Sequence, residues 1–187
     1  FSTRIVNLEP RSPDFKPEFA NSYEIGFKSI WGNGLLRLNG SAFYTDYKGT
    51  QIVVRPQLAP LVFNAGKANI KGFELEWTVI ASDNLLLTGS IGHIDAKYQQ
   101  LDNIVTNAGI SLDHQLQQTP KWVFNMGAAY AIYMNNNITL TPRIDYSFRS
   151  KNYVDAENTE ILSQPSFSLV NASMALDIDD KNLRFVF

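Results

Sequence analysis

Hydrophobic and polar residues alternate along much of this chain with the two-residue period of a β-strand. The clearest case is the segment 138–149. Its even-numbered residues share an apolar face: Ile138, Leu140, Pro142, Ile144, Tyr146 and Phe148. Its odd-numbered residues are all polar or charged. Because successive side chains of a strand project to opposite sides, this segment is predicted to separate an apolar surface from a polar one.

The same alternation recurs in several further segments, at 22–31, 72–80, 121–133 and 168–178, and less cleanly at 35–47 and 85–98. With the short segment 181–187, these make about eight strands. No segment keeps a helical period over three turns. The chain is therefore predicted to be all-β.

Short and long connections alternate between these strands. The short ones, at 32–34, 83–84, 135–137 and 179–182, are rich in Gly, Asn and Asp, which favour tight turns. The long ones cover 48–64, 99–119 and 151–165. An antiparallel up-and-down meander would place all tight turns at one end and all long loops at the other. Outer-membrane barrels have this asymmetry, and soluble lipocalin-like barrels do not require a strand as long as 63–82.

Aromatic residues gather near both ends of the expected strands. One set lies near the long loops: Tyr44, Tyr47, Tyr98, Trp122, Tyr146, Phe148 and Tyr153. Trp31 and Tyr133 lie near the tight turns. Two such bands are typical of the girdles at the two membrane interfaces. They favour a membrane barrel, with its apolar face toward lipid, over a soluble sandwich with the same alternation.

Pro142 interrupts the cleanest strand because proline cannot donate a hydrogen bond to a neighbouring strand. We expect a bulge or a locally unpaired position there.

Composition narrows the class further. The chain has 187 residues, of which 44% are hydrophobic and 12% aromatic, and a formal net charge of -2. This charge gives no sign of a nucleic-acid partner. Cysteine is absent, which excludes disulfides and thiolate chemistry. No apolar run reaches the length of a transmembrane helix, and residues 1–6 lack the pattern of a signal peptide.

Little in the sequence points to catalysis or to a bound metal or cofactor, and we predict none. The two histidines, His93 and His114, lack partners at a recognisable spacing. Asp177, Asp179 and Asp180 lack the glycine and distal glutamate of a calcium loop and are expected to form a polar turn.

Charged residues on the polar sides of the strands are expected to point into a barrel lumen. They are Glu24, Lys28, Arg37, Glu74, Glu76, Arg143, Asp145 and Arg149. A Lys or Arg facing lipid at the membrane midplane would cost about 2–4 kcal/mol, which fixes the orientation of each strand.

Five stretches resemble a known family. They are FKPEFANSYEIGFK (15–28), SAFYTDYKGTQ (41–51), NAGKANIKGFELE (64–76), TPKW (119–122) and SLVNAS (168–173). In this order they resemble the barrel of TonB-dependent outer-membrane receptors. That family has about 22 strands, an N-terminal plug domain and a TonB box, and the plug and the box have no counterpart here. Residues 1–187 are thus expected to be a late, C-terminal part of a larger transmembrane β-barrel domain, with further strands after Phe187.

The resemblance implies a function in the outer membrane of a Gram-negative bacterium. Such a receptor binds a scarce nutrient outside the cell, and the TonB complex acts on the plug domain to drive active transport. The lumen-facing charges would then form cross-strand ion pairs and contact the plug. Polar residues of the long loops become candidates for ligand contact: His114, Gln115, Gln117, Asn152 and Asn158.

These loop residues do not decide between a ferric siderophore, a cobalamin-like ligand and a sugar, although a siderophore-like ligand is our first expectation. Two other readings remain open at this point. The chain could be a complete small outer-membrane barrel or porin of eight strands, or a soluble carbohydrate-binding β-sandwich.

Overall fold

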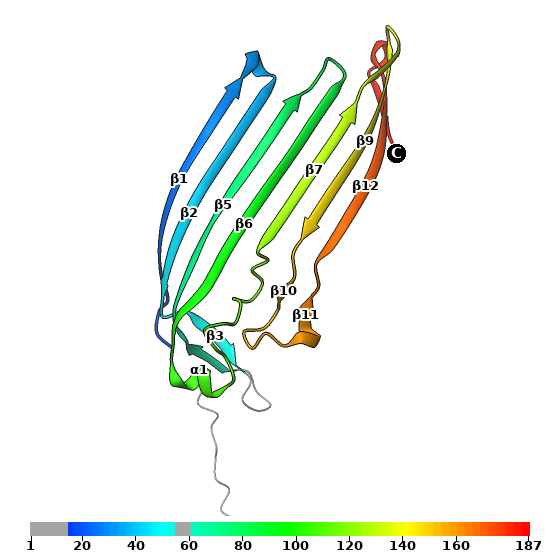
Figure 1. Cartoon of the computed structure of the whole chain (residues 1–187). Helices are drawn as coiled ribbons and strands as arrows, with labels where there is room; N and C mark the ends of the chain where they lie inside the picture. The colour runs from blue at the N-terminus through cyan, green and yellow to red at the C-terminus, as the bar shows by residue number, and fades with distance from the viewer. Residues whose placement is uncertain (1–14, 55–60) are drawn as a thin grey trace, which may run out of the picture.

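The computed structural model describes residues 15–54 and 61–187. Its main sheet is a single antiparallel layer in which neighbouring strands follow chain order (Figure 1). The strands are β1 (Phe19–Trp31), β2 (Leu36–Lys48), β5 (Gly66–Ile80), β6 (Leu85–Leu101), β7 (Trp122–Tyr130), β9 (Ile138–Arg149), β12 (Phe167–Ile178) and β13 (Leu183–Val186), and β8 (Ile132–Asn135) pairs with β9. The predicted meander is confirmed. Within the described residues no pairing joins β1 to β13, so the layer is open.

Tight turns lie at one end of the sheet and long connections at the other, as predicted (Figure 1). At the turn end, η1 (Gly32–Gly34) and η3 (Asp179–Lys181) each link two strands. Asn33 adopts φ 55° and Asn182 φ 48°, the left-handed backbone that Asn tolerates better than most residues. The loop end carries β3 (Gln51–Val54), β4 (Leu61–Asn64), α1 (Asn103–Asn107), β10 (Asn152–Tyr153), η2 (Glu160–Leu162) and β11 (Ser163–Gln164).

The observed strand limits differ from the predicted ones in several places. β5 begins at Gly66, earlier than expected, and β6 continues to Leu101. The expected long strand 63–82 is divided, because β4 ends at Asn64 before β5 begins. Residues 55–60 of the loop predicted at 48–64, and the start of the chain read for a signal peptide, lie outside the described residues. No helix among the described residues is long and apolar enough to cross a membrane.

Pro142 produces the locally unpaired position that its missing N–H predicts. It keeps its register with Met174 of β12, but β7 pairs with β9 only as far as Ala129 opposite Arg143. Pairing resumes in β8. Between the two strands, the backbone N–H of Ala131 donates to the Asn84 carbonyl (2.8 Å), and the Asn84 side chain donates to the Ala131 carbonyl (2.6 Å). The tight turn at 82–84 thus satisfies the backbone where the ladder is interrupted.

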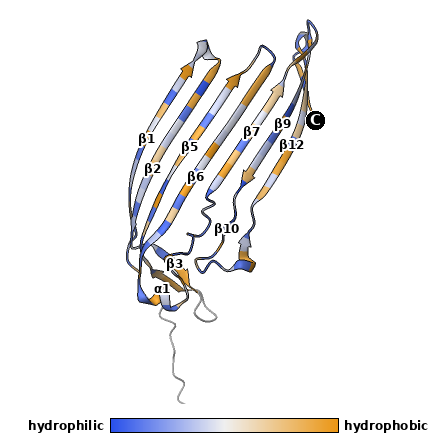
Figure 2. Cartoon of the chain, viewed as in Figure 1, coloured by the Kyte–Doolittle hydropathy of each residue, from blue (hydrophilic) through white to orange (hydrophobic). Residues whose placement is uncertain are grey.

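The strand register assigns every side chain of the sheet to one of two faces. Asp145 lies opposite Gly127, which lies opposite Thr88, and Thr88 lies opposite Thr78. We call the side that carries Asp145 the polar face and the side that carries Ile144 the apolar face. Figure 2 shows the resulting alternation of hydrophilic and hydrophobic positions along each strand.

Glycines opposite aromatic residues allow close packing across the sheet. The registers pair Phe27 with Gly40, Phe43 with Gly72 and Trp77 with Gly89. A Cβ added at residue 89 would lie 2.1 Å from Cζ2 of Trp77, and one added at residue 40 would lie 2.6 Å from Cε1 of Phe27. Each ring therefore occupies the space that a side chain on the next strand would need.

A small hydrophobic core forms where the loops fold over the polar face. Its buried members come from β3, the link between β4 and β5, β5, β6, α1 and the loops at 99–119 and 151–165: Ile52, Val54, Ala65, Ala68, Tyr98, Val105, Ile110, Leu116 and Ala156. Tyr47, Ile70 and Ala96 pack against it from the polar face. Near the loop end, the side chains on the polar face are therefore mostly apolar, because loop residues cover them instead of water.

Candidate functional site

All eight charged residues predicted to point inward lie on the polar face. The registers place Glu24 and Lys28 of β1, Arg37 of β2, and Glu74 and Glu76 of β5 on this side. Arg143, Asp145 and Arg149 of β9 lie on the same side, aligned through β6 and β7. Four of these residues are acidic and four are basic. The face is therefore charged but balanced, which favours polar contacts of both signs over attraction of an ion of one sign.

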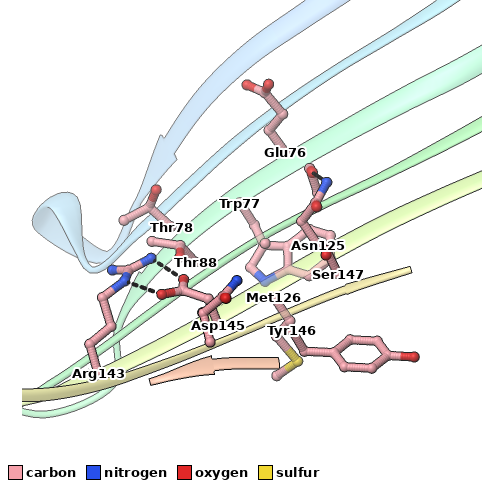
Figure 3. A pocket seen from close by; sticks show the side chains of 14 residues that line it. Glu76, Trp77, Thr78, Thr88, Asn125, Met126, Arg143, Asp145, Tyr146 and Ser147 are labelled. Atoms are coloured by element: carbon pink, nitrogen blue, oxygen red, sulfur yellow. Dashed lines mark hydrogen bonds and ion pairs between the residues drawn. The ribbon is translucent and has the colours of Figure 1, made fainter. Parts of the chain in front are cut away.

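Two hollows on this face contain most of these residues. The first, of about 480 Å³, lies over β1, β2 and β5 and is lined by Glu24, Lys28, Glu74 and Glu76 among others. The second, of about 470 Å³, runs from β5 across to β12 and is lined by Glu76, Arg143 and Asp145 (Figure 3). Arg37 and Arg149 line neither hollow. Glu76 contributes to both, so the two hollows adjoin.

Arg143 and Asp145 form the best-defined contact in the second hollow. They are two residues apart on one strand, so their side chains lie side by side on the same face. Arg143 Nε donates to Asp145 Oδ2 at 2.7 Å, and Nη2 donates to Oδ1. Both side chains are 38% exposed. Such a partly solvated ion pair is screened by water and adds little to stability, so it serves chiefly to fix where the two charges point.

Gly127 makes room for this ion pair, and sequence reasoning did not identify it. A Cβ at residue 127 would lie 2.6 Å from Arg143 Nη2, 2.6 Å from Asp145 Oδ1 and 2.8 Å from Thr88 Oγ1. The sequence showed only a glycine on the polar side of a strand. Its importance depends on the register, which puts Gly127 opposite Asp145. Close by, Asn125 Nδ2 donates to Ser90 Oγ at 3.1 Å, which adds an uncharged polar patch.

The five loop residues proposed for ligand contact have different environments. The backbone N–H of Gln115 donates to Asn158 Oδ1 (2.7 Å), and Asn158 Nδ2 donates to the Gln115 carbonyl (2.9 Å). His114 Nδ1 lies 3.2 Å from the Ala156 carbonyl oxygen. Asn152 is buried in β10, and Gln117 is exposed. Three of the five thus join the loop at 99–119 to the loop at 151–165, and Gln117 has its side chain free to meet solvent.

A second ion pair orders the loop at 151–165. Lys151 Nζ donates to Glu160 Oε1 at 2.6 Å and lies 4.8 Å from the centroid of the Tyr153 ring. The hydrogen bond from Lys151 lowers the pKa of the Glu160 carboxyl, and the same bond raises the pKa of the Lys151 ammonium group. Both charged forms are therefore favoured in this loop.

The aromatic residues of the loop end divide between the two faces. Tyr44, Trp122, Tyr146 and Phe148 lie on the apolar face, as a girdle requires. Tyr47 and Tyr98 lie on the polar face and pack in or against the loop-end core. At the turn end, Trp31 is on the apolar face, but Tyr133 pairs with Thr139 on the polar face. The girdle prediction was wrong for Tyr47, Tyr98 and Tyr133, because proximity to a strand end does not determine the face. It was also wrong for Tyr153, which lies in the separate β10–β11 sheet.

The two histidines occupy separate environments. His93 lies on the apolar face with its ring centroid 4.2 Å from that of Trp122 and 5.8 Å from that of Phe73. His114 belongs to the loop at 99–119. Across residues 15–54 and 61–187, no group of three or more His, Asp or Glu side chains is arranged to hold a metal ion.

Residues 3–187 match the family described as "TonB dependent receptor-like, beta-barrel". The chain belongs to this family. The resemblance carried by the five sequence stretches is thereby confirmed, and it accounts for the long antiparallel strands, the turn and loop ends, and the two unlike faces. Members of the TonB-dependent receptor family are outer-membrane β-barrels of Gram-negative bacteria and act as transport receptors.

Solved structures of TonB-dependent receptors have the same fold. The ferric yersiniabactin uptake receptor FyuA from Yersinia pestis is 21% identical, and the match covers 86% of this chain and 23% of that protein with a TM-score of 0.65. BauA, the ferric preacinetobactin receptor from Acinetobacter baumannii, is also 21% identical, with 92% and 24% covered and a TM-score of 0.68. The copper transporter OprC is 14% identical, with 87% and 23% covered and a TM-score of 0.64. The chain thus spans about a quarter of the length of these receptors.

Proposed function

We propose that this chain forms part of the barrel wall of an outer-membrane receptor that takes up a scarce nutrient by TonB-coupled transport. The observation that carries the proposal is the separation of the faces. Eight charged residues from four strands share one side of a meander whose other side presents Ile25, Leu75, Ile144 and similar residues. In a membrane this arrangement is stable only with the apolar face toward lipid and the polar face toward the lumen.

The polar face would contact the plug domain of the full receptor. Its balanced charges and two adjoining hollows suit a hydrated interface with the plug. Such an interface can hold the plug in one state and release it in another. Arg143 and Asp145 already neutralise each other's charge. A contact with the plug there would therefore be made mostly by Asn125 and Ser147, and by the donor and acceptor atoms of the pair that its own hydrogen bonds leave unused. The TonB complex would act through that plug, and the wall itself would supply no chemistry.

A ferric-siderophore-like compound is the ligand we infer first. FyuA and BauA, which share the fold, are receptors for ferric yersiniabactin and ferric preacinetobactin. OprC has the same fold and is a copper transporter, so the fold alone does not select the ligand. In this chain the loop end offers Gln117 and other uncharged polar side chains for contact with a ligand.

An uptake experiment with the full-length protein tests this proposal. Cells expressing it, in a strain without other iron receptors, would be supplied with ferric siderophores of several chemical classes carrying radioactive iron. We expect accumulation of at least one of them, and collapse of that uptake when a protonophore removes the inner-membrane proton gradient. Uptake that continues without the gradient would indicate a passive pore, and the absence of uptake for every ferric siderophore would reject the ligand class.

The two other functions considered from the sequence lead to different behaviour. A β-sandwich needs two packed sheets, whereas the described residues form a single main layer with small hairpins at one end. A complete eight-stranded barrel would refold alone in detergent and migrate differently on a gel before and after heating. We expect this chain expressed alone to show no such shift, and the full-length protein to show it.

A further inference from the structure

We propose that the apolar face carries, just beyond its aromatic row, a binding surface for the anionic phosphate headgroups of membrane lipids. The surface is the outer lysine band, defined by Lys48, Lys67, Lys71 and Lys97. This inference rests on the proposed placement of the sheet in a membrane. It concerns the side of the sheet that faces away from the transported ligand.

The register places all four lysines on the lipid-facing side. On β5, Lys67 and Lys71 share the parity of Phe73 and Leu75, and Lys48 lies opposite Lys67. Lys97 lies opposite Asn69, two positions further along β6 from Asp95. The opposite side of the same three strands is occupied by the loop-end core. The lysines therefore cannot be reassigned to the lumen without inverting strands β2, β5 and β6.

Their height along the strands matches the headgroup region. Phe73, His93 and Trp122 form a row of rings in mutual contact, as expected at the edge of the hydrocarbon. The Lys71–Asp95 pair is the next outward-facing row, and the row of Lys97 follows it. For strands tilted by about 45°, each two-residue step rises roughly 5 Å along the membrane normal. Lys71 and Lys97 would then lie about 5 and 10 Å beyond the rings, where lipid phosphates are found.

The band has an excess of positive charge. Asp95 is shared by Lys71 (3.6 Å) and Lys97 (3.2 Å), and Asp46 lies 3.8 Å from Lys48. Four lysines thus face two aspartates. The side chains of Lys48, Lys71 and Lys97 are 56%, 63% and 64% exposed, so they can reach a further anion.

Two of the lysines repel each other across neighbouring strands, and Asp46, 3.8 Å from Lys48, offsets this repulsion only in part. Lys48 and Lys67 are directly opposite each other on neighbouring strands. Like charges in this position destabilise a sheet. A phosphate between them would remove the repulsion, and Asp95, by holding Lys71 and Lys97 together, would present a second phosphate with two ammonium groups.

The test uses the full-length protein purified in a neutral detergent, with lipid retention measured by native mass spectrometry. The probe is lipid A carrying two phosphates, compared with the same lipid A from which both phosphates have been removed. Replacing all four lysines by Gln should weaken binding of the phosphorylated probe about a hundredfold or more, since each basic residue near a charged headgroup contributes about fivefold. Lys181→Gln, at the opposite end of the sheet, is the matched control and should bind as the wild type does.

Several results would overturn this inference. The wild type could bind the two lipids equally, or the four-glutamine variant could bind the phosphorylated lipid as well as the wild type does. Displacement of the lipid by an excess of inorganic phosphate would indicate a free-phosphate site instead. If the four-glutamine variant does not fold, the four-arginine variant must retain binding and each single Gln variant must weaken it. A receptor that binds the lipid but transports no ferric siderophore would refute the proposed ligand and leave this surface standing.

Discussion

Replacing Gly89 by Ala should destabilise the folded sheet by displacing Trp77. The new Cβ would lie 2.1 Å from Cζ2, 2.4 Å from Cε2 and 2.9 Å from Cη2 of the indole, all well inside van der Waals contact. The ring must therefore move by about 1 Å or more. Trp77 is also in contact with Phe124, whose ring centroid is 6.4 Å away, so the movement disturbs a second strand neighbour.

The size of the effect follows from two opposing terms. Forcing additional atoms into a packed site costs about 1–3 kcal/mol. Replacing glycine by alanine in a strand regains about 0.5–1 kcal/mol of backbone entropy. We expect a net loss of about 1 kcal/mol in the free energy of unfolding, within a range of about 0–2.5 kcal/mol.

Gly92 on the same strand provides the matched control. A Cβ there would meet only Glu74 Cγ, at 4.0 Å, so Gly92→Ala should be neutral or stabilising by about 0.5–1 kcal/mol. The two variants of the full-length protein would be compared in guanidinium, with the folded fraction read from heat-dependent gel migration. In a Trp77→Ala background the cost of Gly89→Ala should disappear. Equal stability of the two glycine variants, or a cost that persists without Trp77, would refute the packing argument.

Three further predictions concern the faces and the loops. Ile144→Arg puts a charge on the apolar face and should lower the free energy of unfolding by about 2–4 kcal/mol if it lies near the midplane. Ser147→Arg on the polar face should be nearly neutral. The same gel assay compares the two variants, and equal costs would contradict the face assignment. Asn158→Gly tolerates the φ of 55° but removes both side-chain bonds to the loop at 99–119, so chymotrypsin should cut that loop faster; an unchanged rate would show that the bonds do not hold it. The Lys151–Glu160 contact should be fully present above the ordinary pKa of a Glu carboxyl and should weaken as pH falls through the lowered pKa of Glu160. At high pH it should weaken again as pH rises through the raised pKa of Lys151. Hydrogen exchange of residues 152–164 should follow this profile, and Lys151→Gln should flatten it.

The faces of the sheet were predictable because they depend on a local rule. Alternation along segments such as 138–149 fixes which side chains share a side, and short turns preserve that parity from one strand to the next. The eight charges predicted to point inward therefore fell on one face without knowledge of the register. Pro142 was equally local, since its missing N–H has the same consequence in any strand.

The loop-end core and the glycine–aromatic pairs could not be predicted in the same way. Ile52, Val54 and Ile110 belong to short segments without a usable period, and they meet only because the hairpin and α1 fold over the sheet. Tyr98 was assigned to the girdle because it lies near a strand end, but its register with Ala68 places it on the polar face. Gly89 and Gly127 gain their roles from residues on other strands. Each of these features depends on pairing between distant parts of the chain.

The loop-end core also constrains the order of assembly. Ile52 and Ala156 belong to one cluster although about a hundred residues separate them in the sequence. Closing so long a loop before the strands between them have paired carries a large entropic cost, and contacts between distant residues slow folding. The cluster should therefore form after β5, β6, β7 and β9 have aligned. Until then its apolar side chains are exposed to solvent, which favours aggregation of the incompletely folded chain.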